Sequence, residues 1–219
     1  MPASSTADPK DTQRKSRKGE LTAGRILDAA EELFSERGYA GTSLREVAAV
    51  VGIRIPSLYN HFESKETLYA AVLERVLRPV FRALSDYAVQ GRGGGERPRK
   101  LVETVMRVMA EHPRLANLIQ HETLTGGEHL TPMLQSWLAP IFARADELVD
   151  VGLAESRWDR DELSLLVLAM YHIIVGYFTI APMYALLDGR DLLSEEMLAK
   201  QTRVFGDLVE LIFGAAPTR

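Results

Sequence analysis

Apolar residues recur at intervals of three and four along most of this chain, which is the spacing of one helix face. The first clear stretch starts at Leu21 and ends before Gly38, a residue that commonly follows the last turn of a helix. Its predicted apolar face consists of Ile26, Ala29, Ala30, Leu33 and Phe34. No segment alternates apolar and polar residues as a half-buried strand does. The sequence therefore predicts an all-α fold of about nine helices.

Two short helices follow the first one. Ser43, with Glu46 three positions later, is typical of a capping box at a helix start. Gly52 ends that helix after about two turns. Pro56 then falls in the first turn of the next helix, where proline is tolerated.

The remainder of the chain also has helical spacing. Ser64 is expected to cap a fourth helix that continues past Pro79 with a kink, and the glycine-rich residues 90–95 predict a loop. Five further helices are expected, each ending or starting near a proline, a glycine or a capping residue. Their approximate bounds are 101–112, 113–126, 131–149, 159–187 and 194–213.

Composition narrows the class of protein. Of 219 residues, 46% are hydrophobic and 26% charged, which is the balance of a globular protein. Because the chain has no cysteine, disulfides and thiolate metal sites are excluded. The first twenty residues lack the apolar core of a secretory signal, and no apolar run approaches the roughly 20 residues of a membrane span. We therefore expect a cytoplasmic protein without a membrane contact.

The charge is unevenly distributed. The formal net charge is −4, but up to Arg75 the 11 basic residues balance 11 acidic ones, so the acidic excess lies beyond that point. Residues 1–20 are predicted to be a disordered basic arm. Its cations are Lys10, Arg14, Lys15, Arg17 and Lys18. Such an arm is either a solvated tail or a contact for DNA phosphates, and the sequence leaves both readings open.

Two short helices joined by a turn at Gly52 are the pattern of a helix-turn-helix, although many all-α proteins contain one. The order of residues is more specific than the pattern. The informative pieces are the helix before Gly38-Tyr39, the run 42–48, Gly52-Ile53, and the run 57–62 followed by residues 64–66. With these pieces, residues 26–73 resemble the DNA-binding region of the TetR (tetracycline repressor) family.

The resemblance implies a dimeric transcriptional repressor with a helix-turn-helix DNA-binding domain at residues 21–75. A helical ligand-binding and dimerisation domain would follow at 76–219. It implies backbone-positioning contacts to phosphate from Thr42, Ser43, Tyr59, His61 and Lys65. Donors at these positions are near helix ends, where phosphate oxygens can be reached. For Tyr59 and His61, packing within the small core is the alternative role.

Base reading falls to the front of the second short helix, at Arg54, Ile55, Pro56, Ser57 and Asn60. Arg54 can pair with a guanine edge and Asn60 with an adenine. Arg54 departs from the small hydroxyl residue common in the family at this cap, and a phosphate contact is its alternative role.

The last two helices are too apolar to be shielded by one neighbour each, which predicts a homodimer joined through a four-helix bundle. A small apolar or aromatic effector is expected to release the operator by shifting the arrangement of the reading helices. The candidate pocket residues, which also suit a plain core, are Met106, Met109, Leu118, His121, Trp137, Ile141, Tyr171, His172 and Phe178.

Other classes of function were weighed against this one. The five histidines lack the spacing of metal ligands, so neither a metal nor a cofactor is expected. A helical enzyme is the main rival from another class, but adjacent acidic pairs near helix starts resemble dipole complements rather than acid and base. A third reading keeps the DNA-binding dimer and makes it independent of an effector or controlled by a partner protein.

Overall fold

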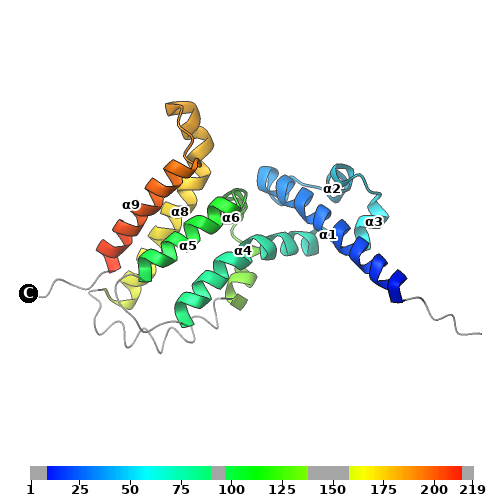
Figure 1. Cartoon of the computed structure of the whole chain (residues 1–219), viewed down its shortest axis with the longest axis horizontal. Coiled ribbons are helices and arrows are strands. Elements are labelled where there is room, and N and C mark those ends of the chain that lie inside the picture. The colour runs from blue at the N-terminus through cyan, green and yellow to red at the C-terminus, as the bar shows by residue number, and fades with distance from the viewer. Residues whose placement is uncertain (1–8, 90–96, 138–157, 214–219) are drawn as a thin grey trace, which may run out of the picture. The chain divides into compact units, whose positions relative to one another are not determined.

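The computed structural model describes residues 9–89, 97–137 and 158–213, and these residues form helices and turns without a strand. Figure 1 shows the helices α1 (Pro9–Arg37), α2 (Leu44–Val51), α3 (Ile55–Tyr59), α4 (Lys65–Val89), α5 (Arg97–Glu111), α6 (Leu115–Leu124), α8 (Arg160–Asp188) and α9 (Glu195–Phe213). Residues 130–137 are also helical. The all-α prediction is confirmed. The chain forms two compact units, residues 1–73 and 74–219, which are described separately below.

Apolar side chains from α1, α2, α3 and the start of α4 meet in the core of the N-terminal unit. The predicted inner face of α1 is buried along its whole length, from Ile26 to Phe34. Phe34 packs edge-on against Tyr69 of α4, with ring centroids 4.7 Å apart. Leu58 is the buried residue of the short α3 and attaches that helix to the core. One side of α3 is therefore anchored while the rest faces outward.

The predicted helix starts and stops around α2 are confirmed. Ser43 accepts a hydrogen bond from the Glu46 N–H, and the Glu46 carboxylate accepts one from the Ser43 N–H at 2.9 Å. The Ser43 hydroxyl also donates to this carboxylate, and that hydrogen bond, the one from the Ser43 N–H and the nearby Arg37 lower the pKa of Glu46. Gly52 ends α2 with a left-handed φ of 74°, a conformation that residues with a Cβ rarely adopt.

The N-terminal part of α1 differs from the sequence prediction. Residues 9–20, expected to be disordered, continue α1 as regular helix. Arginine, lysine and glutamate are good helix formers, and a helix that has already nucleated extends without paying for a new nucleus. The periodic apolar pattern begins only at Leu21, which is why hydrophobic spacing alone missed this extension.

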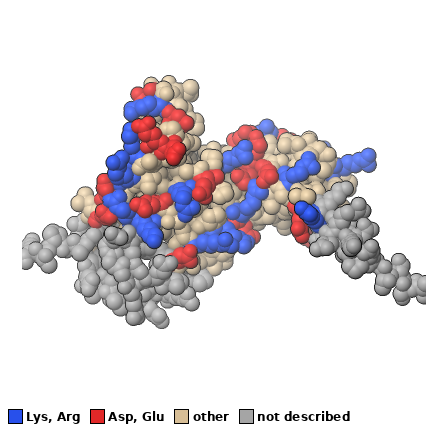
Figure 2. Space-filling model, in the orientation of Figure 1, with Lys and Arg blue, Asp and Glu red and all other residues tan. Residues whose placement is uncertain are grey.

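In the C-terminal unit, α5 packs against α9 and α6 against α8. Arg99 of α5 crosses α9 at Gly206, where a Cβ would approach its guanidinium to 2.7 Å. The Arg99 Nη2 donates to Glu210 at 2.9 Å and also pairs with Asp207, and these carboxylates raise the pKa of Arg99. Figure 2 shows acidic and basic side chains intermixed on the visible surface of this unit.

The helix α8 begins where the sequence predicts, but it contains a longer apolar stretch than the sequence analysis expected anywhere in the chain. Asp159 and Glu162 form the expected capping box, and Gly189 ends the helix. Residues Leu168–Asp188 are nevertheless long and apolar enough to cross a membrane by length and composition, so the expectation of no such segment is wrong on that measure. Tyr171, His172 and Gly176 interrupt the aliphatic residues without making the stretch polar. Only 28% of that stretch is buried within the chain.

Several sequence predictions fall on residues outside the described part of the chain. These are the glycine-rich loop, the part of the seventh predicted helix beyond Trp137, and the stop at Gly214. The helix α4 continues through Pro79, as expected.

Glu122 is a buried carboxylate that the sequence did not single out for a structural role. Its side chain is 1% exposed, and Oε2 accepts hydrogen bonds from the His129 and Leu130 N–H groups at 3.1 and 3.0 Å. These donors lie at the start of the helical segment 130–137, so Glu122 of α6 caps that segment from outside it.

We predict that Glu122→Ala lowers the free energy of unfolding by about 1–3 kcal/mol, because the part-buried His129 N–H and the buried Leu130 N–H lose their acceptor. Urea unfolding followed by circular dichroism measures this change. The matched control is Gln120→Ala, an exposed position on the same helix, with an expected effect within about 0.5 kcal/mol. Equal effects of the two substitutions would contradict the capping role of Glu122.

Candidate nucleic-acid interface

The turn between α2 and α3 is fixed from two sides. Gly52 donates its N–H to Ala49 O, and Ile53 donates to Ala48 O at 3.0 Å, which satisfies carbonyl groups at the end of α2. Arg25 of α1 donates from Nη2 to the Val51 carbonyl at 2.7 Å. Because α1 and the turn are tied together in this way, the direction in which α3 leaves α2 is set by the core of the unit.

The predicted reading residues lie on the outward part of α3 and its caps. Arg54, Pro56 and Asn60 are exposed, while Ile55 and Ser57 are half-buried. Arg54 is the N-cap with an extended backbone and no side-chain cap hydrogen bond. Its guanidinium is therefore not used to close the helix. The structure brings all five residues together on one short element anchored by Leu58.

An open hollow lies where the start of α2, the end of α3 and the start of α4 meet. It gathers two predicted phosphate-contacting side chains, Tyr59 and Lys65, with the Ser43 cap. The full lining is Ala40, Thr42, Ser43, Leu44, Arg45, Ile55, Tyr59, Glu63, Ser64, Lys65 and Glu66. The first residues of α2 and of α4 are part of this lining, and the start of a helix carries first-turn N–H groups and the positive end of the helix dipole. Such an arrangement favours an anion.

Lys65 is held in this hollow by aromatic and acidic neighbours. Its Nζ is 4.2 Å from the centre of the Tyr39 ring, and the Tyr39 hydroxyl donates to Glu66 at 2.5 Å. The hydrogen bond from that hydroxyl is the main cause that lowers the pKa of Glu66 to about 2. Hydrogen bonds from the Glu66 backbone N–H and from the Ser64 side chain lower it further. Glu66 is therefore ionised at neutral pH and accepts from Tyr39.

Thr42 has an internal role, contrary to the phosphate contact inferred for its hydroxyl. It is 3% exposed, and its Oγ1 lies 3.1 Å from both the Leu33 and Gly38 carbonyls, to which it donates. The Thr42 N–H donates to Tyr39 O. Because its donors are engaged within the fold, Thr42 closes the turn after α1. It precedes the cap of α2 by one residue, which turns its side chain into the core.

Ser43 and His61, two more of the predicted phosphate-contacting residues, also make contacts within the fold. The Ser43 hydroxyl is shared with Glu46 in the capping box, which leaves the Leu44 and Arg45 N–H groups as the first-turn donors of α2. His61 is half-buried in the turn after α3, where its N–H donates to Leu58 O at 2.9 Å. It is not part of the hollow's lining.

Three residues of this region were not assigned by sequence reasoning. Arg25 and Tyr39 act through contacts between residues that are far apart in sequence, and local spacing gives no signal for them. Arg45 is exposed and lines the hollow. Its position in the first turn of α2, just after the Ser43 cap, is the feature of the sequence that could have indicated this location.

The predicted effector residues that the structure describes lie in several different surroundings within the C-terminal unit. Met106, Met109, Leu118 and Phe178 are buried. Trp137 packs edge-on against Phe81, with ring centroids 4.5 Å apart. Of the polar candidates, His121 is half-buried, the Tyr171 hydroxyl is 2.8 Å from Thr123 Oγ1, and His172 is exposed with Nδ1 2.9 Å from Leu168 O. Ile141 lies outside the described residues.

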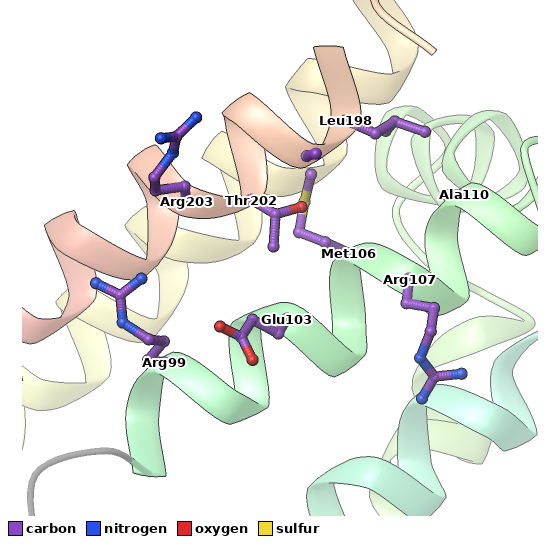
Figure 3. Close-up of a pocket in the computed structure, with 9 residues that line it drawn as sticks. Arg99, Glu103, Met106, Arg107, Ala110, Leu198, Thr202 and Arg203 are labelled. Carbon is purple, nitrogen blue, oxygen red and sulfur yellow. The ribbon is translucent and has the colours of Figure 1, made fainter. Parts of the chain in front are cut away.

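A shallow groove between α5 and α9 is the other hollow of note (Figure 3). Its lining comprises Arg99, Glu103, Met106, Arg107, Ala110, Leu198, Ala199, Thr202 and Arg203. Met106 is the only predicted effector residue among them. Two of these cations form ion pairs within the chain: Arg99 pairs with Glu210 of α9, and Arg107 pairs with Glu111.

Comparison with known families gives two matches that together span most of the described chain. Residues 26–72 match the family of bacterial regulatory proteins named tetR. Residues 96–209 match a C-terminal domain described as tetracyclin repressor-like. The first match covers α2, α3 and the hollow beside them.

Individual relatives give the same picture. A helix-turn-helix transcriptional repressor, KstR2 of Rhodococcus jostii, is 35% identical over 145 residues, which cover 59% of this chain and 70% of the relative. An uncharacterised helix-turn-helix regulator of Mycobacterium tuberculosis, Rv1255c, is 35% identical over 100 residues; the match covers 46% of this chain and half of the relative's length. A TetR family transcription regulator from Marinobacter aquaeolei has a similar fold, with a TM-score of 0.67 and 18% identity over 93% of this chain and all of that one.

We predict that Tyr39→Phe destabilises the N-terminal unit at neutral pH and less so in acid. Glu66 has a lowered pKa in the folded state, so its contribution is present above its ordinary pKa near 4.5 and is lost as the pH falls toward 2. Urea unfolding of both proteins at several pH values between 7 and 3 measures the difference. Tyr59→Phe, at an exposed tyrosine, is the control. A difference that stays constant across this range would show that the hydroxyl does not act through Glu66.

Proposed function

Because this chain belongs to the TetR family of bacterial regulatory proteins, we propose that it is a transcriptional regulator that binds operator DNA as a homodimer. The observation that carries the proposal is the exposed α3 surface, held by the Gly52 turn beside the hollow of Tyr59 and Lys65. Regulation of this kind takes place in the cytoplasm, where bacterial DNA lies.

Sequence is read by the exposed end of α3 in the major groove. The Arg54 side chain makes no cap hydrogen bond, so it can donate two hydrogen bonds to one guanine edge. The Asn60 amide can pair with adenine. Ile55 and Pro56 offer apolar contact to a thymine methyl group. One good bidentate pair discriminates against a wrong base by roughly 1–3 kcal/mol. Leu58 holds the helix in place and reads nothing.

Phosphates are bound by the hollow next to α3. Lys65 supplies a full positive charge, Tyr59 a hydroxyl, and the first turn of α2 the N–H groups of Leu44 and Arg45. Arg45 adds a second cation at the same rim. Contacts of this kind fix the position of the protein on DNA and carry no sequence information.

A second copy of the chain is the partner that suits α8 and α9. Large apolar side chains recur on α8 at the spacing of one helix face while remaining exposed; they are Leu165, Leu168, Ile180, Met183 and Leu187. On α9, Val204 and Leu211 are 55% and 74% exposed. Packing these faces across a two-fold axis removes them from water and produces two reading helices per regulator.

We further propose that a small, largely apolar effector binds the C-terminal unit and releases the regulator from its operator. Support comes from the aromatic and methionine-rich interior of the C-terminal unit, with Tyr171 and His121 as polar tips. A tenfold loss of operator affinity needs only about 1.4 kcal/mol of coupling between the two sites. A regulator that responds to no effector is the second candidate, since the buried residues also serve as ordinary core.

For DNA recognition, we predict that Lys65→Gln weakens binding to all duplexes about equally, because a phosphate contact is lost. In contrast, Asn60→Ala should cost about 1–3 kcal/mol at one base pair and relax the preference there. Selection of bound sequences from random DNA, followed by fluorescence anisotropy at several salt concentrations, measures both effects.

The matched control for Lys65 is Lys100→Gln, an exposed lysine of the C-terminal unit with the same change in charge. It should leave binding close to that of the unaltered protein. If Asn60→Ala leaves the selected sequence unchanged at every position, α3 does not read DNA in the way proposed.

For the dimer, we predict that Leu168→Glu converts the protein to monomers, because it places two carboxylates in an apolar interface. Sedimentation equilibrium at micromolar concentration measures the association. The control is Leu124→Glu, since Leu124 is 74% exposed on α6 and lies outside the α8–α9 faces. A dimer that survives Leu168→Glu would locate the interface elsewhere.

A further inference from the structure

Tyr39 lies in the turn between α1 and α2, where the core of the N-terminal unit fixes the position of its ring. The side chain is half-buried. Its ring packs against two buried rings, with centroids 6.3 Å from Phe34 and 5.1 Å from Tyr69. Thr42 closes the turn from the other end, because its N–H donates to the Tyr39 carbonyl. Tyr39 is therefore a rigid platform rather than a surface side chain with free rotation.

The same side chain contacts the first turn of α4 at two neighbouring residues. The Lys65 Nζ lies 4.2 Å from the centre of the ring, and the hydroxyl donates to Glu66 at 2.5 Å. Within the described part of the chain, no ion pair joins Lys65 to a carboxylate. The Tyr39 ring is thus the group that holds the Lys65 ammonium, while the hydroxyl holds the adjacent carboxylate.

A lysine held in this way is oriented before a phosphate arrives. A free lysine side chain populates many rotamers, and ordering it on binding costs conformational entropy. A ring face attracts a cation electrostatically, and an ammonium has three N–H donors, so donors remain for a second partner. Lys65 lines the hollow beside α3 while it lies over the ring. The contact with Tyr39 therefore keeps the cation at the place where a phosphate would bind.

We propose that Tyr39 is a positioning residue for DNA binding, which holds the Lys65 ammonium at the hollow through the face of its ring and makes no contact with DNA itself. The inference rests on the proposed function and adds a residue to it. A cation–π contact at a partly exposed site raises the population of the oriented lysine by up to about two- to fivefold. Observed affinity scales with the population of the binding-competent state. Base preference is unchanged, because Lys65 contacts phosphate.

The test changes the charge distribution of the ring and leaves its shape almost unaltered. In the ring-fluorinated variant, Tyr39 is replaced by pentafluorophenylalanine, whose ring face is no longer negative. The reference is Tyr39→Phe, which lacks the same hydroxyl and keeps the negative face. Both are made alone and together with Lys65→Gln, which completes a double-mutant cycle.

The matched control applies the same two replacements at Tyr184. The ring of Tyr184 also lies near a cation, since the Arg190 guanidinium is 5.8 Å from its centre, but it belongs to the C-terminal unit. Affinity for the duplex selected by the unaltered protein is measured by fluorescence anisotropy. Urea unfolding identifies a temperature at which every variant is folded.

We expect the ring-fluorinated variant to bind the duplex about two- to fivefold more weakly per protomer than Tyr39→Phe. In the Lys65→Gln background the two should bind equally, because the cation that the ring holds has been removed. A purely structural role of Tyr39 would lower affinity in both backgrounds. The selected base preferences should agree among all variants, and the replacements at Tyr184 should leave affinity unchanged.

Three results would overturn the inference. The first is equal binding by the ring-fluorinated variant and Tyr39→Phe while Lys65→Gln weakens binding. The second is a loss of the same size with and without Lys65, which would assign Tyr39 to packing alone. The third is an equal loss at Tyr184, which would attribute the effect to fluorination.

Failure of the proposed function is distinguishable from these results. If Lys65→Gln leaves both affinity and its salt dependence unaltered, the phosphate contact of Lys65 is absent, and the inference that rests on it falls with it. If Lys65→Gln lowers the slope of log affinity against log salt by about one per protomer, the phosphate contact stands. The comparison at Tyr39 then decides the inference by itself.

Discussion

The left-handed turn at Gly52 is the constraint on which the N-terminal unit depends. A φ of 74° lets the chain reverse after two turns of α2 and start α3 within three residues. Arg25 donates to the last carbonyl of α2 beside the same turn, so α1 is tied to the point from which α3 departs. A side chain at Gly52 would be strained even though space around it is open, because the cost lies in the backbone. The exposed α3 surface and the hollow beside it take their positions from this turn.

Stability and the proposed recognition of DNA depend largely on different residues in this small unit. Thr42, Leu58 and the Phe34–Tyr69 pair are buried and hold the helices together, whereas Arg54, Asn60 and Arg45 are exposed. Lys65 belongs to both groups, since it lies over the Tyr39 ring and still lines the hollow. The carboxylates of Glu46 and Glu66 each accept a hydrogen bond from a neighbour within the fold.

Local signals in the sequence were sufficient for the helix starts and stops, and insufficient for contacts made across the fold. Ser43 with Glu46, Asp159 with Glu162, and the stop at Gly38 each depend on residues close in sequence, and each is present in the structure. Thr42 was assigned to DNA by resemblance, but its hydroxyl satisfies Leu33 and Gly38 carbonyls that only the folded turn brings near. The helical extension at residues 9–20 escaped detection because its sequence has no apolar period. The effector residues were chosen for composition, and composition does not distinguish a cavity from a filled core.

Amide hydrogen exchange of the full chain, with and without a duplex selected by the protein, tests the central claim most directly. The account predicts that DNA slows exchange at the first-turn amides of α2, Leu44 and Arg45, and across the residues from Arg54 to Asn60. These amides border the hollow and the groove-facing helix. Slowed exchange confined to residues beyond 74, with the amides of 44–60 unchanged on a bound duplex, would contradict it.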